Sequence, residues 1–369
     1  MREITSIEIK RVIEELKEKL VGSRLRKFYD LGEGSFRLMF YNKAGNIQIF
    51  CKLLLTFNET SFTEEAEEAT PFAMGIRKRL ENSTLTGISQ HNSDRVIVLE
   101  FGKEGYRLII EMLGKGNFIL ADMSGRIELC YRIARYKERS ISPGGVYAFP
   151  KAGAIPFEEI SKASVESVLE RDAEGKKLIR HLSDSINIGP IYLEEIIKRS
   201  GMDPRAGLEE EKKEKLVSEL LNFFKRAGAD KPRIYMENGE EKDYSIVALE
   251  RYRGFDYAEY DTMNELLDNL YLRKRSEEVD EERLEQKERT LANISAQKEL
   301  ANATEIEAES CNRAANKIFE NMQGINTLIQ YMRSNKRARV EEVQSAFPGI
   351  KIKGLDLKNK RVTIELKGE

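Results

Sequence analysis

The residues best able to carry chemistry are an acid followed by a base, Asp94 and Arg95. They lie between the turn residues 92–93 and a predicted strand, so a sheet could hold both side chains outward. An arginine held in this way can form paired hydrogen bonds to a phosphate or stack on a base, and the aspartate could orient it or accept from a ribose hydroxyl. The alternative is an aspartate that caps the turn beside a solvated arginine, and the residue types alone favour it.

Lys115 and Asn117 alternate with glycines in the turn Gly114–Asn117. This turn is not a P-loop, because no Ser or Thr follows the lysine and the four-residue spacer is missing. One interpretation is a hairpin turn. The other is a close backbone approach to nucleic acid, with Lys115 on a phosphate.

Two basic clusters could supply further electrostatic attraction. One lies on a predicted helix, and the other is interleaved with Tyr131 and Tyr136, a combination that suits an RNA backbone and unstacked bases. A solvated helix face or loop is the alternative for each. The clusters are Arg77, Lys78 and Arg79, and then Arg132, Arg135, Lys137 and Arg139.

Metal and cofactor sites are not expected. His91 and His181 have no partners at metal-ligand spacing, and we expect both to be surface or packing residues. The cysteines, Cys51, Cys130 and Cys311, form no CxxC pair, which argues against a zinc finger or a disulfide framework and favours a reducing compartment.

The composition narrows the classes of partner. Lys and Arg number 61 and Asp and Glu 63, for a net charge of −2, so any nucleic-acid contact must come from local patches. The sequence contains neither a signal-peptide pattern nor an apolar run long enough for a bilayer. We therefore expect a cytoplasmic protein without membrane contact.

An α+β domain over residues 1–152, rich in antiparallel strands, is expected to position these residues. It begins with a helix over 5–20, where Thr5 and Glu8 have the spacing of a capping box; this role alone explains the glutamate. A second helix should begin at Pro71 and run to Leu80. Strands are predicted over 24–29, 35–41, 46–55, 84–90, 95–101, 106–111, 117–122 and 127–133.

Residues 153–262 follow a Pro- and Gly-rich connector and have mainly helical periodicity. Helices over 176–183 and 191–200 flank a turn at Gly189-Pro190, which is the layout of a helix-hairpin-helix. Gly189 would permit the sharp turn and leave backbone N–H groups free for a phosphate, unless the turn is a plain connection. A helix over 209–226 and two short strands, 233–236 and 244–247, complete this domain.

Residues 263–369 are expected to form a coiled-coil arm and part of a middle domain. Residues 263–310 contain no proline or glycine and have widely spaced apolar residues, so they predict one long, exposed helix. Such a helix needs a partner, and self-association would supply one. Helical sequence over 312–346 and a hairpin at 350–366 follow.

Three segments in order, 6–25, 85–99 and 110–120, resemble the N-terminal domain of the NFACT family of ribosome-associated quality-control factors. The turn at 188–190 with the residues after it resembles that family's helix-hairpin-helix. The resemblance implies a fold like that of the formamidopyrimidine DNA glycosylases in the first domain. It also implies an N-terminal fragment of an archaeal member, since family members continue into a returning coiled-coil arm and an NFACT-R domain.

In function, the resemblance implies a non-catalytic factor that binds the stalled large ribosomal subunit. Such a factor holds peptidyl-tRNA and aminoacyl-tRNA so that the ribosome extends the nascent chain with a C-terminal tail. Asp94 and Arg95 match the family's signature for handling tRNA, and Glu8 stands where an Asp is often found on the same face. Lys115 and Asn117 would also contact tRNA, while the two basic clusters and Gly189 would contact nucleic-acid backbone.

Two other functions remain open. A glycosylase of the formamidopyrimidine type needs a proline after Met1 and then a Glu, but Arg2-Glu3 occupies that place and the four-cysteine zinc finger is missing. A surface adhesin, as some bacterial members have been called, would need export, and the missing signal peptide argues against it.

Overall fold

The computed structural model describes residues 2–63, 69–102, 105–151, 153–171 and 177–366. The chain divides into two compact units, Met1–Ser276 and Glu277–Glu369, which are described separately. In the described part of the chain, no helix is both long and apolar enough to span a membrane.

The first unit opens with α1 (Ser6–Leu20), and the predicted capping box is present. The Thr5 side chain accepts from the backbone N–H of Glu8, while the Glu8 carboxylate accepts from the N–H of Thr5. Apolar residues at helical spacing, from Ile9 to Leu20, are buried along one face of the helix. The prediction of this helix is confirmed.

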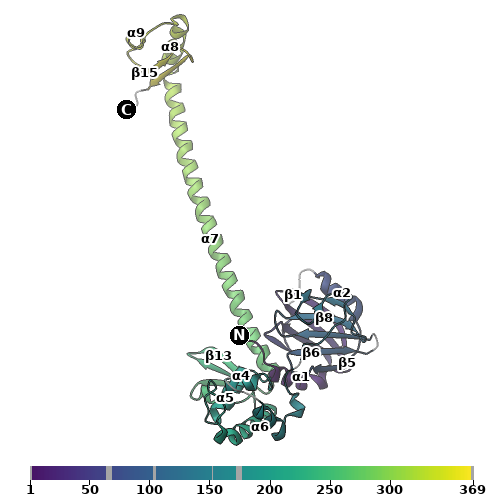
Figure 1. Ribbon diagram of the computed structural model, residues 1–369. Coiled ribbons are helices and arrows are strands. Elements are labelled where there is room, and N and C mark those ends of the chain that lie inside the picture. Colours follow the sequence, from purple (N-terminus) through teal and green to yellow (C-terminus); the bar gives the residue numbers. More distant parts are fainter. Residues whose placement is uncertain (1, 64–68, 103–104, 152, 172–176, 367–369) are drawn as a thin grey trace. The chain divides into compact units, whose positions relative to one another are not determined.

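Two antiparallel sheets follow, with α2 (Pro71–Leu80) between them in the chain (Figure 1). Aromatic residues join the sheets: the Phe118 ring lies 5.8 Å from Phe28 and 4.4 Å from Phe36, measured between centroids. The first sheet has β1 (Arg24–Gly32), β2 (Ser35–Asn42), β3 (Gly45–Lys52) and β4 (Thr56–Glu59), in that order. The second has β5 (Leu85–Gln90), β6 (Val96–Phe101), β7 (Tyr106–Glu111), β8 (Asn117–Asp122) and β9 (Ile127–Cys130).

The remainder of the first unit is mainly helical and shares one hydrophobic core with α1 and the sheets. After a short ribbon of β10 (Ala134–Arg135) and β11 (Ser140–Ile141), the chain forms η1 (Phe157–Glu159), α3 (Lys162–Glu170), α4 (Leu178–Ser183), α5 (Pro190–Arg199), η2 (Glu210–Lys212) and α6 (Lys213–Ala229). A sheet in the order β13-β12-β14 comes next, made of β12 (Arg233–Glu237), β13 (Glu240–Ser245) and, after η3 (Glu250–Tyr252), β14 (Asp256–Glu259).

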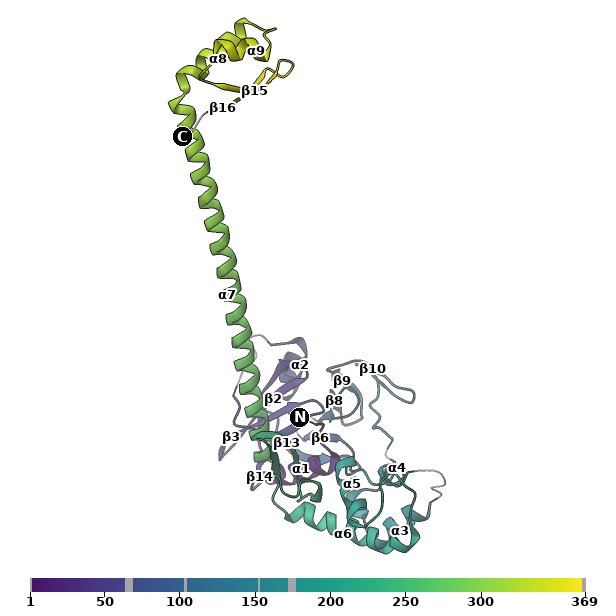
Figure 2. The same cartoon turned by 90° about the vertical axis from the view of Figure 1, so that its left-hand side faces the viewer.

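Helix α7 (Met263–Glu320) begins in the first unit, where Leu266, Leu267 and Leu270 are buried. It extends ten residues beyond the predicted end. The sequence over 312–346 is helical as predicted, with interruptions at Asn321 and after Ser334, where the backbone leaves helical geometry. The second unit continues with α8 (Met322–Ser334), α9 (Val340–Ala346) and the predicted hairpin, β15 (Lys351–Asp356) with β16 (Arg361–Glu365), around a small core (Figure 2).

Candidate nucleic-acid interface

Asp94 and Arg95 lie where the β5–β6 turn enters β6, as expected, but their side chains do not pair with each other. The Asp94 carboxylate accepts from the backbone N–H of Arg95 at 2.7 Å and from the Asn187 side-chain amide at 3.3 Å. The Arg95 guanidinium forms an ion pair with Glu3, at 2.5 Å. The expectation that the aspartate orients the arginine side chain is therefore wrong: Asp94 holds the backbone, and the N-terminal segment holds the guanidinium.

This arrangement leaves Arg95 accessible. Its side chain is 25% exposed and that of Glu3 51%. An ion pair this exposed contributes at most about 1 kcal/mol, so exchange of Glu3 for a phosphate would cost little. The bond from Asn187, in the turn before α5, ties the Asp94 loop to the helical part of the unit.

Glu8 is fully buried, which contradicts the expectation that it contacts tRNA. Besides capping α1, its carboxylate pairs with the Arg2 guanidinium and accepts from the Tyr192 hydroxyl in α5. All these partners belong to the protein, so no acceptor site on Glu8 faces solvent. The capping interpretation is confirmed.

Arg2 is held from several sides. Its Nε donates to Asp243 at 2.9 Å, and its guanidinium carbon lies 4.0 Å from the centroid of the Tyr244 ring. Burial by itself lowers the pKa of Arg2, but the Glu8 carboxylate, Tyr244 and Tyr192 together raise that pKa well above its usual value. The position at which a glycosylase carries its nucleophile is thus occupied by a charged side chain that is engaged in structural contacts.

The two polar residues of the glycine-rich turn differ: Asn117 is buried and structural, and Lys115 is exposed. Asn117 is buried, and its side chain exchanges hydrogen bonds with the backbone of Arg132, at 2.8 and 2.9 Å. It thereby fixes the end of β8 and cannot also contact tRNA, so that expectation is wrong. Lys115 is exposed and makes no ion pair with a described residue.

The basic clusters are only partly available. Arg77 donates to the carbonyl of Phe28 at 2.8 Å, and Arg79 pairs with Glu128 at 3.1 Å. Arg132 donates to the carbonyls of Lys115 and Gly116, and Arg139 pairs with the buried Glu111. The predicted cations that are exposed and have no ion pair among the described residues are Lys78, Lys115, Arg135 and Lys137.

Gly189 has the backbone conformation that the sequence predicted, with φ of 97°. The backbone of Gly189 packs closely on Thr5 of the same chain, because a Cβ at this position would lie 2.5 Å from Cγ2 of Thr5. The Ser6 hydroxyl donates to the carbonyl of Asn187 in the same turn. The turn therefore packs on the start of α1, and contact with a nucleic-acid backbone is not needed to explain the glycine.

The two histidines pack as expected. The His91 ring stacks on Phe149 with 3.6 Å between centroids, and Nε2 of the buried His181 lies 2.8 Å from the carbonyl oxygen of Val168. The described residues contain no group of three or more His, Cys, Asp or Glu that could hold a metal ion.

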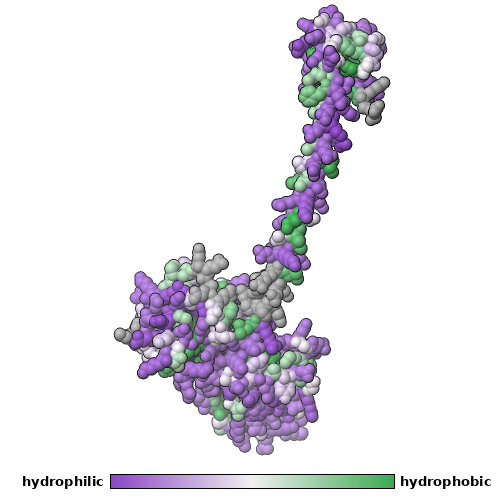
Figure 3. Space-filling model, turned by 180° about the vertical axis from the view of Figure 1, so that it is seen from behind, coloured by the Kyte–Doolittle hydropathy of each residue, from purple (hydrophilic) through white to green (hydrophobic). Residues whose placement is uncertain are grey.

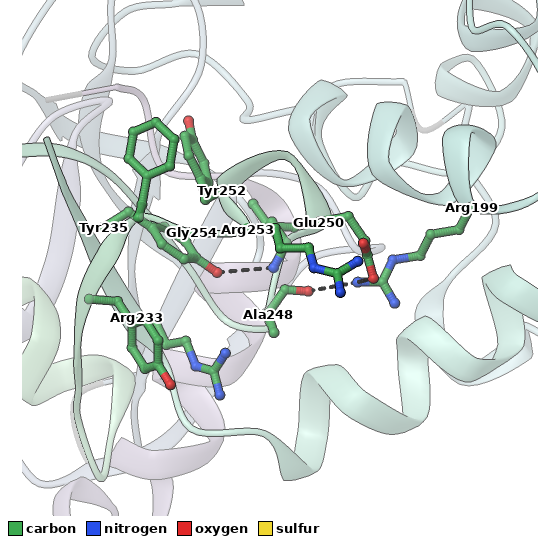
Figure 4. A pocket seen from close by; sticks show the side chains of 11 residues that line it. Arg199, Arg233, Tyr235, Ala248, Glu250, Tyr252, Arg253 and Gly254 are labelled. Carbon is green, nitrogen blue, oxygen red and sulfur yellow. Dashed lines mark hydrogen bonds and ion pairs between the residues drawn. The ribbon is translucent and has the colours of Figure 1, made fainter.

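Sequence reasoning missed an arginine- and tyrosine-rich pocket of about 280 Å³ beside β12 (Figure 4). Arg199 at its edge pairs with Glu195 and donates to the carbonyl of Ala248, while Arg233 pairs with Glu259. Two of its three arginines are therefore already neutralised. The local signal in the sequence is the pair Tyr252-Arg253, both of which line the pocket.

Comparison with known proteins identifies the chain's family. A family model described as the NFACT N-terminal and middle domains matches residues 5–353. The chain belongs to the NFACT family. The crystal structure of a fibrinogen-binding protein from Staphylococcus aureus shares the fold of this NFACT chain, at a TM-score of 0.59 and 22% identity, covering 72% of this chain and 98% of that one.

Two curated relatives are similar over most of this NFACT chain. The archaeal Rqc2 homolog aRqcH of Methanocaldococcus jannaschii is 25% identical over 92% of this chain and 54% of its own length. The ribosome quality control complex subunit NEMF of Mus musculus is 22% identical over 89% of this chain and 34% of its own length. The chain thus spans about half, or less, of the length of these relatives.

Proposed function

We propose that this NFACT chain is the tRNA-holding part of a cytoplasmic, non-catalytic ribosome-associated quality-control factor that acts on the stalled large ribosomal subunit. The names of its curated relatives support the ribosomal role. The observation that carries the tRNA contact is the Asp94–Arg95 loop: Asp94, which accepts from Asn187, holds the backbone of Arg95, and Glu3 pairs with its accessible guanidinium.

In this proposal the protein supplies positioning and the ribosome supplies the chemistry. Arg95 exchanges Glu3 for a tRNA phosphate or stacks on an unpaired base, and the exposed cations Lys78, Lys115, Arg135 and Lys137 add attraction to the backbone. The α4–α5 turn serves as a helix-hairpin-helix that supports this surface, and α7 serves as one arm of a coiled coil. No cofactor is required. Peptidyl-tRNA and aminoacyl-tRNA held on the subunit would allow C-terminal tailing of the nascent chain.

The test is RNA crosslinking of the wild type and of Asp94→Ala/Arg95→Ala in the presence of large ribosomal subunits and tRNA. We expect the double variant to lose most of its tRNA crosslinks, because a loss of about 1.4 kcal/mol of contact energy weakens the affinity for tRNA tenfold. The control is Lys231→Ala/Asp261→Ala, which removes another exposed acid–base pair, with a 2.7 Å N–O distance. Undiminished tRNA recovery from the Asp94/Arg95 variant would contradict the proposal.

A lyase function is less well supported, because Arg2 lacks the amine of the glycosylase nucleophile and is committed to Glu8 and Asp243. Borohydride trapping on abasic DNA would detect the covalent adduct of such an enzyme. We expect none.

A further inference from the structure

A second basic surface lies at one end of the first sheet, where three loops meet. It is a groove of about 670 Å³ whose lining includes Arg24 and Arg26 of β1, Tyr41 of β2 and Lys43 of the β2–β3 turn. The loops beside it are fixed by backbone hydrogen bonds: Gly22 donates to Leu85 at 2.8 Å, and Asn82 donates to Leu25 at 2.7 Å. The groove is therefore part of the folded scaffold.

The charge of this groove is not neutralised by the protein. Arg24, Arg26 and Lys43 are all exposed, and none forms an ion pair with a described residue. No carboxylate lines the groove. The pocket beside β12 differs in this respect, since Arg199 and Arg233 there are paired with glutamates. Three unpaired cations around one groove raise the local concentration of an anionic ligand.

An aromatic ring lies among these cations. Arg24 and Tyr41 are direct cross-strand partners, and the Arg26 guanidinium lies over the Tyr41 ring, 5.3 Å from its centroid. Tyr41 nevertheless keeps 46% of its surface exposed. Strand alternation explains the arrangement, because Leu25 points into the core and leaves Arg24 and Arg26 on the outer face.

We propose that this groove binds an unstacked nucleotide of single-stranded RNA. The base packs against the Arg26–Tyr41 pair, and the flanking phosphates contact Arg24 and Lys43. Aromatic rings and guanidinium planes are the surfaces on which proteins stack unpaired bases, and lysines and arginines neutralise the phosphates. The inference rests on the proposed function of the chain as an RNA-holding factor and adds a second contact, remote in sequence from Asp94 and Arg95. An acidic peptide would use the cations but would gain no comparable stacking from the ring.

The experiment measures fluorescence anisotropy of a labelled single-stranded RNA of about 12 nucleotides at salt concentrations from about 50 to 200 mM. Loss of two phosphate contacts in Arg24→Ala/Lys43→Ala should lower the slope of log Kd against log salt by about 1.4. Tyr41→Ala should weaken binding about fivefold or more without changing that slope, and Tyr41→Phe should bind as the wild type does. The charge-matched control, Lys151→Ala/Lys162→Ala, removes two exposed cations that are paired with Glu138 and Glu166 and should leave the slope unchanged.

The outcomes separate this inference from the proposed function. If the groove variants bind the short RNA as the control does, the groove is not an RNA site. The same conclusion follows if Tyr41→Ala has no effect and an acidic peptide of equal charge competes as well as RNA. If the groove variants lose the short RNA while whole tRNA binds neither the wild type nor the variants, the groove stands and the tRNA-holding function fails. If whole tRNA binds, only Asp94→Ala/Arg95→Ala weakens it, and the groove variants bind the short RNA as the control does, the function stands and the groove fails.

Discussion

Arg2 connects segments that are far apart in the sequence. Its guanidinium pairs with Glu8 in α1 and with Asp243 in β13, and Glu8 accepts from the hydroxyl of Tyr192 in α5. Burial raises the pKa of Tyr192 well above its usual value, and the Glu8 charge adds to this effect, so the hydroxyl stays protonated and remains a donor. Glu8, which the sequence predicted to contact tRNA, instead joins α1 to α5 directly and to β13 through Arg2.

Glu8→Gln tests this structural role. Removal of one partner from a buried ion pair costs roughly 3–5 kcal/mol, and we expect about 3 kcal/mol because Arg2 keeps its bond to Asp243. Urea unfolding followed by circular dichroism measures the change. Glu158→Gln, which breaks an exposed pair with Lys10, is the control and should cost less than about 1 kcal/mol. Unchanged stability together with lost tRNA binding would return Glu8 to the RNA-contacting residues.

His91 reports on the Asp94 loop through its pKa. Burial lowers the pKa of His91 below the ordinary value of 6.5, and the Asp94 carboxylate partly opposes this shift. We expect an NMR titration to place the His91 pKa below 6.5, Asp94→Asn to lower it further, and Phe149→Ala to move it back upward as the ring becomes hydrated. The neutral ring therefore stabilises the fold above about pH 6.5, and that contribution is lost as the pH falls through the folded-state pKa. The chain has two histidines, so the spectrum of His91→Gln assigns the ring signals. A His91 pKa above 6.5 would contradict the packing of its ring on Phe149.

At the scale of elements, local patterns predicted most of the fold. The capping box fixed the start of α1, and the alternation of apolar residues located both sheets. The elements missed were α3, the short strands β4, β10 and β11, the edge strand β14 and the one-turn helices η1 and η3, which are too short or too polar for a periodic signal. The burial of Glu8 and Asn117 could not be predicted, because partners up to 184 residues away determine it.

The α4–α5 turn gives a test at this scale. Gly189→Ala should be strongly destabilising, because it combines the cost of positive φ with a clash against Thr5 Cγ2 at 2.5 Å. Gly201→Ala is the matched control: its φ is 84° and its Cβ would meet nothing within 4 Å, so it should show only the backbone cost of about 1–2 kcal/mol. Thermal unfolding of both variants measures the difference. Equal losses would mean that the turn does not pack on α1 as described.

At the scale of the whole molecule, α7 is the element whose partner is undefined. Its described side chains beyond residue 283 are nearly all exposed, including large apolar ones such as Leu284, Leu291 and Ile294. Apolar side chains interrupt the hydrophilic surface along the helix in Figure 3. The three leucine and isoleucine positions are seven and three residues apart and so lie on one face, as in a coiled coil.

We expect two copies of the chain to associate through this face of α7. Leu284, Leu291 and Ile294 leave apolar surface in water along one face of α7, so a second copy that covers this face should stabilise the helix. We expect sedimentation velocity to show a weight-average mass that rises with concentration, and Leu291→Glu/Ile294→Glu to abolish the rise because buried charges would face each other. Asn293→Glu adds a charge on the opposite side of the helix and should leave association intact. A wild-type chain that stays monomeric while circular dichroism reports an intact α7 would show that this helix needs no second copy.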